Sequence, residues 1–203
     1  MLGKLRNRDD LLKRLPRGGV GVELGVAAGG FSLRILEQSR LGFLYSIDMW
    51  AGDRGHDVAQ YRFVLDRLAP YRKRNMPIKM RFDEALPLFK DAYFDFIYVD
   101  GYAHTGEEGG QTFHDWLPKL KPGGIMAGDD YSPAWPQVVS AVDAFAACHG
   151  LKLNVIPSRD TREDGGVDYP SWYVVKPRLP LLTELAATMR DLRRRLGSRF
   201  RAR

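Results

Sequence analysis

Short segments of alternating apolar and polar residues recur along this 203-residue chain, and segments with helical spacing separate them. Alternation with a period of two is typical of strands, whereas apolar residues three and four positions apart are typical of helices. The expected strands are 20–24, 43–47, 78–81, 94–99, 125–128, 151–156 and 172–175. The expected helices are a short one capped by Asp9 or Asp10, one beginning near Leu33, one within 50–77, a turn over 84–88, and helices over 107–120 and 137–148. Strands that alternate with helices predict an α/β domain.

A glycine-rich loop follows the first strand and precedes a helix. Gly25 and Gly30 permit a tight turn and the close approach of a ligand to the backbone, although many α/β proteins use such a loop only for packing. Ala27 occupies the position of the second glycine of a dinucleotide site, and Glu23 places a carboxylate at the strand end. A carboxylate repels a diphosphate and attracts an ammonium or sulfonium group. The loop therefore favours a cationic nucleoside over a dinucleotide.

Glu23-x-Gly25-x-x-x-Gly29 resembles the first motif of class I S-adenosylmethionine-dependent methyltransferases. Segments 44–50, 94–104 and 116–131 are similar to those of small bacterial enzymes that include macrocin-type and Mg-dependent O-methyltransferases. The resemblance implies a Rossmann-like, seven-stranded, mostly parallel sheet with an antiparallel last strand and helices on both faces. It also implies S-adenosyl-L-methionine as the cofactor.

The resemblance assigns cofactor contacts to the loop and to several strand ends. Asp48 lies 23 residues after Gly25, near the spacing at which a carboxylate meets ribose hydroxyls, but it can also be an ordinary strand-end residue. Phe82 and Asp83 fall where related enzymes bind adenine, although Asp83 can instead cap a helical turn. The expected cofactor-binding residues are Glu23, Gly25, Ala27, Gly29, Phe31, Ser32, Asp48, Met49, Phe82, Asp83 and Asp100.

Three carboxylates, Asp100, Asp129 and Asp130, follow two strands that we expect to be neighbours. Such groups repel one another unless one is protonated or a cation is present, and Mg²⁺ prefers oxygen ligands. Their layout is similar to that of metal-dependent O-methyltransferases, so they are candidate metal ligands; alternatively they are structural. We expect His104 or Asp100 to act as the general base, because Ala103 stands where catechol-type enzymes have a lysine. His104 can also be an ordinary loop histidine.

A loop after the second strand carries Trp50, Asp53, His56 and Asp57. Their position after the strand that ends at Asp48 places them near the expected ribose and methyl group. We expect these side chains either to line the substrate entrance or to face solvent.

The basic residues are concentrated at the two ends of the chain. Residues 178–203 contain eight arginines and two acidic residues, and residues 1–19 contain six basic and two acidic residues, so the body from 20 to 177 is net negative although the whole chain carries a formal charge of +6. We expect a helical extension over 1–19, a methyltransferase domain over 20–177 and a basic amphipathic helix over 178–203. That last helix packs on its own domain or on a second copy as a homodimer, or rests on an anionic membrane surface.

The single cysteine, Cys148, excludes a disulfide within the chain, and its apolar neighbours predict a buried position. The first residues lack the apolar run of a secretory signal, so we expect a cytoplasmic protein.

The leading interpretation is transfer of a methyl group to a hydroxyl of a small molecule, such as a sugar or natural product. Two alternatives stay open. The enzyme can act on RNA or a large anionic glycan through its arginine-rich tail, although the expected motif for methylating base amino groups is absent. Alternatively, the chain binds the cofactor without catalysis.

Overall fold

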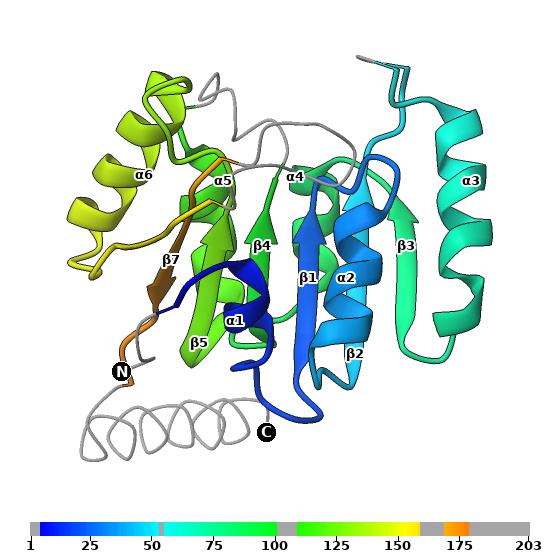
Figure 1. Cartoon of the computed structure of the whole chain (residues 1–203), viewed down its shortest axis with the longest axis horizontal. Helices are drawn as coiled ribbons and strands as arrows, with labels where there is room; N and C mark the ends of the chain where they lie inside the picture. The colour runs from blue at the N-terminus through cyan, green and yellow to red at the C-terminus, as the bar shows by residue number, and fades with distance from the viewer. Residues whose placement is uncertain (1–4, 53–54, 101–108, 159–168, 179–203) are drawn as a thin grey trace, which may run out of the picture.

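The computed structural model describes residues 5–52, 55–100, 109–158 and 169–178. Its seven strands form one sheet in the order β3-β2-β1-β4-β5-β7-β6 (Figure 1). The strands are β1 (Val20–Leu24), β2 (Phe43–Asp48), β3 (Asn75–Lys79), β4 (Phe94–Val99), β5 (Leu120–Gly128), β6 (Asn154–Ile156) and β7 (Ser171–Val175). Pairings among the first five are parallel, and β7 is antiparallel to both β5 and β6. The expected mostly parallel sheet with an antiparallel last strand is confirmed.

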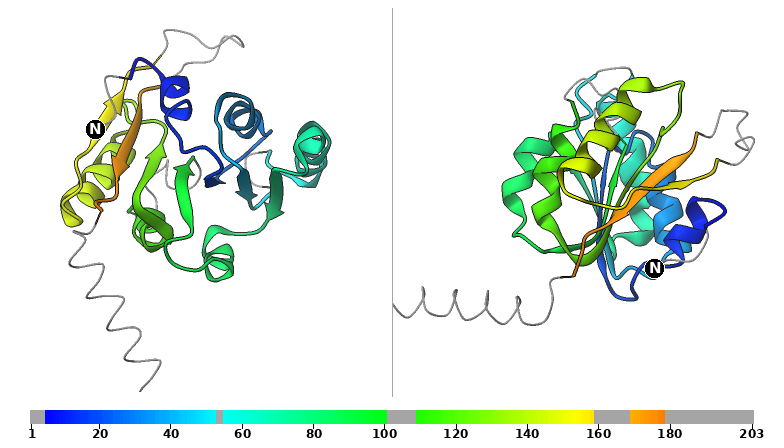
Figure 2. Two further views of the ribbon diagram at one scale, coloured as in Figure 1. Left: turned by 90° about the horizontal axis from the view of Figure 1, so that it is seen from below. Right: turned by 90° about the vertical axis from the view of Figure 1, so that its left-hand side faces the viewer.

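Helices cover both faces of the sheet, as expected (Figure 2). They are α1 (Arg8–Leu12), α2 (Gly30–Gln38), α3 (Val58–Leu68), α4 (Phe82–Ala85), α5 (Gln111–Trp116) and α6 (Pro136–Cys148). The 3-10 turns η1 (Ala69–Tyr71), η2 (Leu86–Leu88) and η4 (Leu117–Lys119) follow α3, α4 and α5. Apolar residues of α1, α2 and α3 pack in one core cluster on one face, and those of α4, α5 and α6 pack in a second cluster on the other.

Strand alternation explains why each face has its own core. Along β2, Leu44 packs with the cluster of α1, α2 and α3, whereas Ile47 packs with the opposite cluster. Along β4, Phe96 and Ile97 divide in the same way. Successive side chains of a strand point to opposite faces, so a strand buried on both faces needs apolar residues at nearly every position.

The order of the strands places the ends of β1 and β4 together. The chain runs outward from β1 to β2 and β3, then returns to pair β4 with the other side of β1. In open α/β sheets, ligands bind at the carboxyl ends of the strands where this reversal occurs. The glycine loop after β1 and Asp100 after β4 both lie at this point.

Several expected boundaries were wrong. The third strand begins at Asn75, three residues earlier than expected, because β3 is an edge strand and tolerates Pro77. The cap of α1 is Asn7, whose side chain accepts a hydrogen bond from the Asp10 amide at 3.1 Å.

Cys148 is exposed rather than buried, because the apolar neighbours Ala144 and Ala147 are themselves exposed and α6 buries a different face.

No helix within the described parts of the chain is both long and apolar enough to cross a membrane. The expected C-terminal helix over 178–203 lies, apart from its first residue, outside the described residues.

Candidate functional site

The glycine loop between β1 and α2 is fixed in place by the end of β2. Oδ2 of Asp48 accepts hydrogen bonds from the amides of Val26, at 2.8 Å, and Ala27, at 2.9 Å. Gly25 and Gly29 have φ values of 95° and 75°, and Ala27 also has a positive φ of 49°. An alanine in this region costs about 1–2 kcal/mol, so its neighbours must hold it there. The two Asp48 hydrogen bonds contribute to that restraint.

Trp50 is a second anchor of this loop, and its role was not anticipated. Its indole N–H donates to the Ala27 carbonyl at 3.0 Å, and its ring lies 4.7 Å from that of Tyr61 between centroids. The side chain is fully buried, so the expectation that Trp50 lines a substrate entrance or faces solvent was wrong. The sequence shows an aromatic residue after a strand end but carries no signal for a bond back to residue 27, 23 positions away.

The other expected entrance residues have local roles or are not described. Asp57 caps α3 by accepting from the Gln60 amide at 2.9 Å, and His56 Nδ1 lies 2.8 Å from the Gln60 side-chain oxygen. Asp53 lies outside the described residues.

Asp48 therefore positions the loop, whatever else it binds. Its second oxygen, Oδ1, accepts a longer hydrogen bond from the Trp50 amide at 3.3 Å. Contact between Asp48 and ribose hydroxyls stays a prediction, and it requires Oδ1 because Oδ2 already has two amide donors. Met49, next to it, is half-buried.

Glu23 lies beneath the glycine loop in a buried polar chain. It is 1% exposed and hydrogen-bonded to Ser32, which in turn lies 3.0 Å from the Ser46 hydroxyl. Asn75 donates to that hydroxyl at 2.9 Å, extending the chain to β3. Burial raises the pKa of Glu23 well above its usual value; the Ser32 hydrogen bond opposes this, and the charges of Asp100 and Asp48 add to it.

This burial refines what Glu23 and Ser32 can do. Both side chains are buried, so direct contact with a cofactor stays a prediction for both. A nearby positive charge favours the ionised form of a carboxyl group and so opposes the effect of burial and acidic neighbours on its pKa. Glu23 is thus able to respond electrostatically to a positively charged ligand.

The residues expected at the adenine lie where β3 ends and α4 begins. Phe82 is half-buried and packs at the edge of one core cluster. The Asp83 side chain is 64% exposed and accepts from the guanidinium of Arg81, with Nε and Oδ1 3.0 Å apart. Arg81 lowers the pKa of Asp83. Arg81 rather than Asp83 is the N-cap of α4, so the capping alternative for Asp83 was wrong, and its contact with adenine stays a prediction.

Asp100 and Asp129 follow neighbouring strands and interact electrostatically. The Asp100 amide donates to the Leu24 carbonyl at 2.7 Å, which continues the pairing of β4 with β1. The charge of Asp100 contributes to the raised pKa values of both Glu23 and Asp129. The expected gathering of acidic groups at this edge of the sheet is therefore present.

Asp129 is paired with an arginine from the N-terminal helix. Nη1 of Arg8 lies 2.5 Å from Oδ2 of Asp129 and donates to the Tyr98 hydroxyl at 3.1 Å. The Ser171 hydroxyl donates to the other oxygen of Asp129 at 3.0 Å. Burial, with smaller contributions from the charges of Asp100 and Asp130, raises the pKa of Asp129 to about 6 despite the opposing charge of Arg8. Sequence reasoning missed Arg8 because 121 positions separate it from Asp129.

Phe31 belongs to the same cluster. Its ring lies 4.2 Å from that of Tyr98 between centroids, and the Arg8 guanidinium lies 5.4 Å from its centroid. A guanidinium over an aromatic face is attracted by the ring quadrupole. Phe31 therefore supports Arg8, and the expected contact between Phe31 and the cofactor stays a prediction.

The three aspartates do not fit a divalent metal ion as they lie. Both oxygens of Asp129 already accept hydrogen bonds, one of them from a cation. Asp130 is 8% exposed and has a positive φ of 60°. The described residues include all three aspartates. Among those residues, the only group of three histidine, cysteine or acidic side chains whose ligand atoms lie within 4.8 Å of one another lies elsewhere. A metal at Asp100, Asp129 and Asp130 would require Arg8 to leave Asp129.

His104, the leading candidate for the general base, lies outside the described residues. The choice between His104 and Asp100 as the base therefore stays a prediction.

Comparisons with known proteins agree with this geometry. Three solved structures share the fold. The O-methyltransferase from Bacillus cereus in complex with S-adenosylhomocysteine has a TM-score of 0.62 and 14% identity, and the match covers 83% of this chain and 80% of that chain. Precorrin-6y C5,15-methyltransferase from Geobacter metallireducens has a TM-score of 0.59 and 16% identity, covering 83% of this chain and 84% of that chain, and Aeropyrum pernix fibrillarin with natively bound S-adenosyl-L-methionine has a TM-score of 0.57 and 16% identity, covering 83% and 73% of the two chains in the same order. No curated protein sequence matches significantly. A family model described as a methyltransferase domain matches residues 22–131, more than half of the chain and the whole segment from the glycine loop to the acidic edge. The chain belongs to this family of methyltransferase domains.

Proposed function

We propose that this protein transfers a methyl group from S-adenosylmethionine to a hydroxyl oxygen of a small molecule. The observation that carries the proposal is the glycine loop anchored by Asp48 at the point where the strand order reverses, within a methyltransferase domain. The neighbouring structures named above include an O-methyltransferase in complex with S-adenosylhomocysteine and a protein with bound S-adenosyl-L-methionine, which supports this donor.

The acidic edge suits a positively charged donor. S-adenosylmethionine carries a sulfonium and an ammonium group, and the product S-adenosylhomocysteine has lost the sulfonium charge. Carboxylates such as Asp48 and Asp100 attract both cations, and a half-buried setting strengthens this attraction relative to water. Release of the product is then favoured because it is less positive than the donor.

The reaction asks the protein mainly for orientation. The acceptor oxygen attacks the methyl carbon in line with the sulfur, the carbon–oxygen bond forms as the carbon–sulfur bond breaks, and the hydroxyl proton passes to a base. Holding the two reactants in this line contributes much of the rate enhancement. Asp100, at the end of β4, is the base candidate among the described residues, and His104 is the other.

We also propose that transfer does not require a divalent ion. Arg8 already supplies a positive charge to Asp129, the residue that a metal at this edge would need. The pair ties the N-terminal helix to the residue that follows β5. Arg8 acts here as a positioning residue for Asp129.

The test is a methyltransferase assay on the full chain with a library of sugars, phenols and other hydroxylated compounds, followed by detection of S-adenosylhomocysteine. We expect turnover with at least one hydroxyl acceptor, unchanged by excess EDTA and lost in Asp100→Asn if Asp100 is the base. Donor binding without transfer to any hydroxyl compound would contradict O-methylation. Activity restored only by Mg²⁺ would contradict the metal-independent route.

A further inference from the structure

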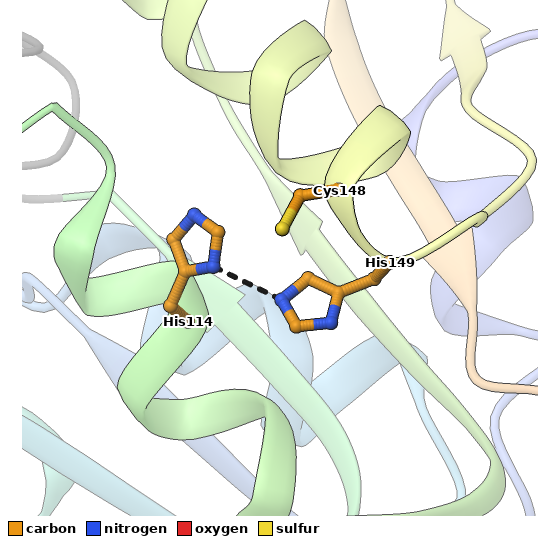
Figure 3. A group of neighbouring side chains, drawn as sticks. All are labelled: His114, Cys148 and His149. Atoms are coloured by element: carbon orange, nitrogen blue, oxygen red, sulfur yellow. Dashed lines mark hydrogen bonds between the residues drawn. The ribbon is translucent and has the colours of Figure 1, made fainter.

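Three metal-binding side chains meet on the face of the domain covered by α5 and α6, away from the acidic edge. His114 comes from α5, Cys148 is the last residue of α6, and His149 is the C-cap of α6 (Figure 3). One ligand atom from each lies within 4.8 Å of the other two. We propose that these residues bind a zinc ion.

The geometry is close to that of a bound ion. Nδ1 of His114 and Nε2 of His149 are 3.0 Å apart, joined by a hydrogen bond, and the Cys148 side chain points toward them in Figure 3. Two nitrogens at 2.0–2.1 Å and a sulfur at about 2.3 Å from a tetrahedral Zn²⁺ are separated from one another by roughly 3.3–3.8 Å. Small side-chain rotations are therefore enough to bind the ion, and two zinc–nitrogen bonds then replace the hydrogen bond between the histidines.

The chemistry of the ligands favours zinc over Mg²⁺ or Ca²⁺. Imidazole nitrogen and thiolate sulfur are ligands for borderline and soft metals, whereas Mg²⁺ and Ca²⁺ take oxygen. Cys148 and His149 are exposed, so water reaches the fourth position of the ion. The site is thus a three-residue site completed by a water molecule.

The surroundings prepare the histidines for a metal. Phe145 packs against both imidazole rings, at 5.3 Å from His114 and 5.2 Å from His149 between centroids. The 13-residue helix α6 ends here, and the negative end of its dipole favours a cation.

Lys176 is the charged group that opposes binding. Its ammonium donates to the Leu117 and Leu120 carbonyls at 2.9 and 2.8 Å, and burial lowers its pKa. Those carbonyls hold the ammonium against the backbone where η4 meets β5. A bound thiolate adds a negative charge that offsets it.

The ion would join α5 to α6 rather than take part in methyl transfer. α6 begins a few residues after Asp130 and runs back along the sheet, so its last residue lies roughly 18 Å along the helix from its first. Removal of the ligands is therefore expected to leave methyl transfer unchanged. The inference does not depend on the proposed function.

The experiment is titration of metal-free, tag-free full-length protein with ZnCl₂ in a calorimeter. We expect one Zn²⁺ per chain, with affinity reduced at least ~10-fold in His114→Ala and in Cys148→Ser, a loss of the size that even supporting residues of metal sites produce. His56→Ala is the matched control, because the His56 ring lies beside Gln60 of α3 and outside the three-residue cluster, and we expect it to retain the wild-type affinity. Wild-type affinity in both ligand variants would overturn the proposal.

Substitution with Co²⁺ identifies the ligands directly. The wild-type complex is expected to show a sulfur-to-cobalt charge-transfer band in the ultraviolet, and Cys148→Ser to lose it. We expect the variants to fold, because all three ligands lie at or near the surface. Circular dichroism checks this. A cobalt complex without the charge-transfer band in the wild-type protein would also overturn the proposal.

Discussion

Replacement of Arg8 by methionine tests the buried ion pair that completes the acidic edge. The Arg8 and Asp129 side chains are 9% and 3% exposed, so water does not screen the pair. Removing one partner of a buried pair leaves an uncompensated charge and typically costs about 3–5 kcal/mol. Methionine keeps much of the arginine's aliphatic volume, so most of the loss reflects charge. We expect Arg8→Met to lower the free energy of unfolding by about 3 kcal/mol or more at pH 8.

The pH dependence of this loss identifies Asp129 as its source. The pKa of Asp129 is raised from 3.8 to about 6, so the folded protein holds this proton more tightly than the unfolded chain. Its contribution to stability is therefore present below about pH 4 and is lost as the pH rises through about 6. Because Arg8 opposes the increase, its removal raises the pKa of Asp129 further, and each unit adds about 1.4 kcal/mol at pH 8. At pH 5 Asp129 is already protonated, so the penalty should be much smaller.

Urea unfolding at pH 5 and pH 8 measures both the loss of stability and its pH dependence. The slopes of the free energy of unfolding against urea concentration are compared to confirm that the variants unfold in the same way. Arg6→Met is the matched control on the same segment: its 82% exposed side chain pairs with Asp10 at 3.2 Å, and we expect no measurable loss because water screens that pair. Addition of Asp129→Asn to Arg8→Met should recover stability at pH 8. Equal effects of the Arg6 and Arg8 variants, or a loss that does not change with pH, would show that the buried pair with Asp129 is not the source of the stability.

Three further predictions concern the glycine loop. Asp48→Ala leaves two loop amides without their acceptor and should weaken S-adenosylhomocysteine binding by at least ~100-fold in calorimetry. This corresponds to about 3 kcal/mol for two hydrogen bonds to a charged group. The variant Asp57→Ala, which removes only the cap of α3, should not change the affinity. Glu23→Gln should make the ligand-free protein more stable than wild type at pH 8 in thermal unfolding, because the raised pKa of Glu23 means that its stabilising contribution is lost as the pH rises; a larger advantage at pH 5 would show that this sign is wrong. Ala27→Gly should stabilise the protein by about 1 kcal/mol because it relieves a positive φ, whereas Ala28→Gly should not, and equal effects would count against strain at Ala27.

Most strands and helices of the fold were predictable because local patterns of apolar and polar residues indicate them. β4 was predicted at its observed limits, since a run of apolar residues between polar ones indicates a buried strand. The glycine loop was predictable because backbone conformation at Gly25 and Gly29 demands those residues. β3 was placed late because Pro77 looks like a strand breaker until the strand is known to lie at the edge.

The tertiary partners within the site were not predictable from one sequence. Nothing near Arg8 distinguishes it from the other basic residues of the N-terminal segment, and only the folded chain brings it to Asp129. The same holds for the hydrogen bond from Trp50 to Ala27. Exposure of Cys148 depends on how α6 is rotated about its axis, which the small residues around it do not determine.

A crystal structure of the protein with S-adenosylhomocysteine will show whether the loop anchored by Asp48 holds the methyl donor. We expect adenosine against the glycine loop, ribose hydroxyls within hydrogen-bonding distance of Asp48 Oδ1, and the Arg8–Asp129 pair intact. Adenosine bound elsewhere on the domain, or Asp48 turned away from the ribose, would contradict it.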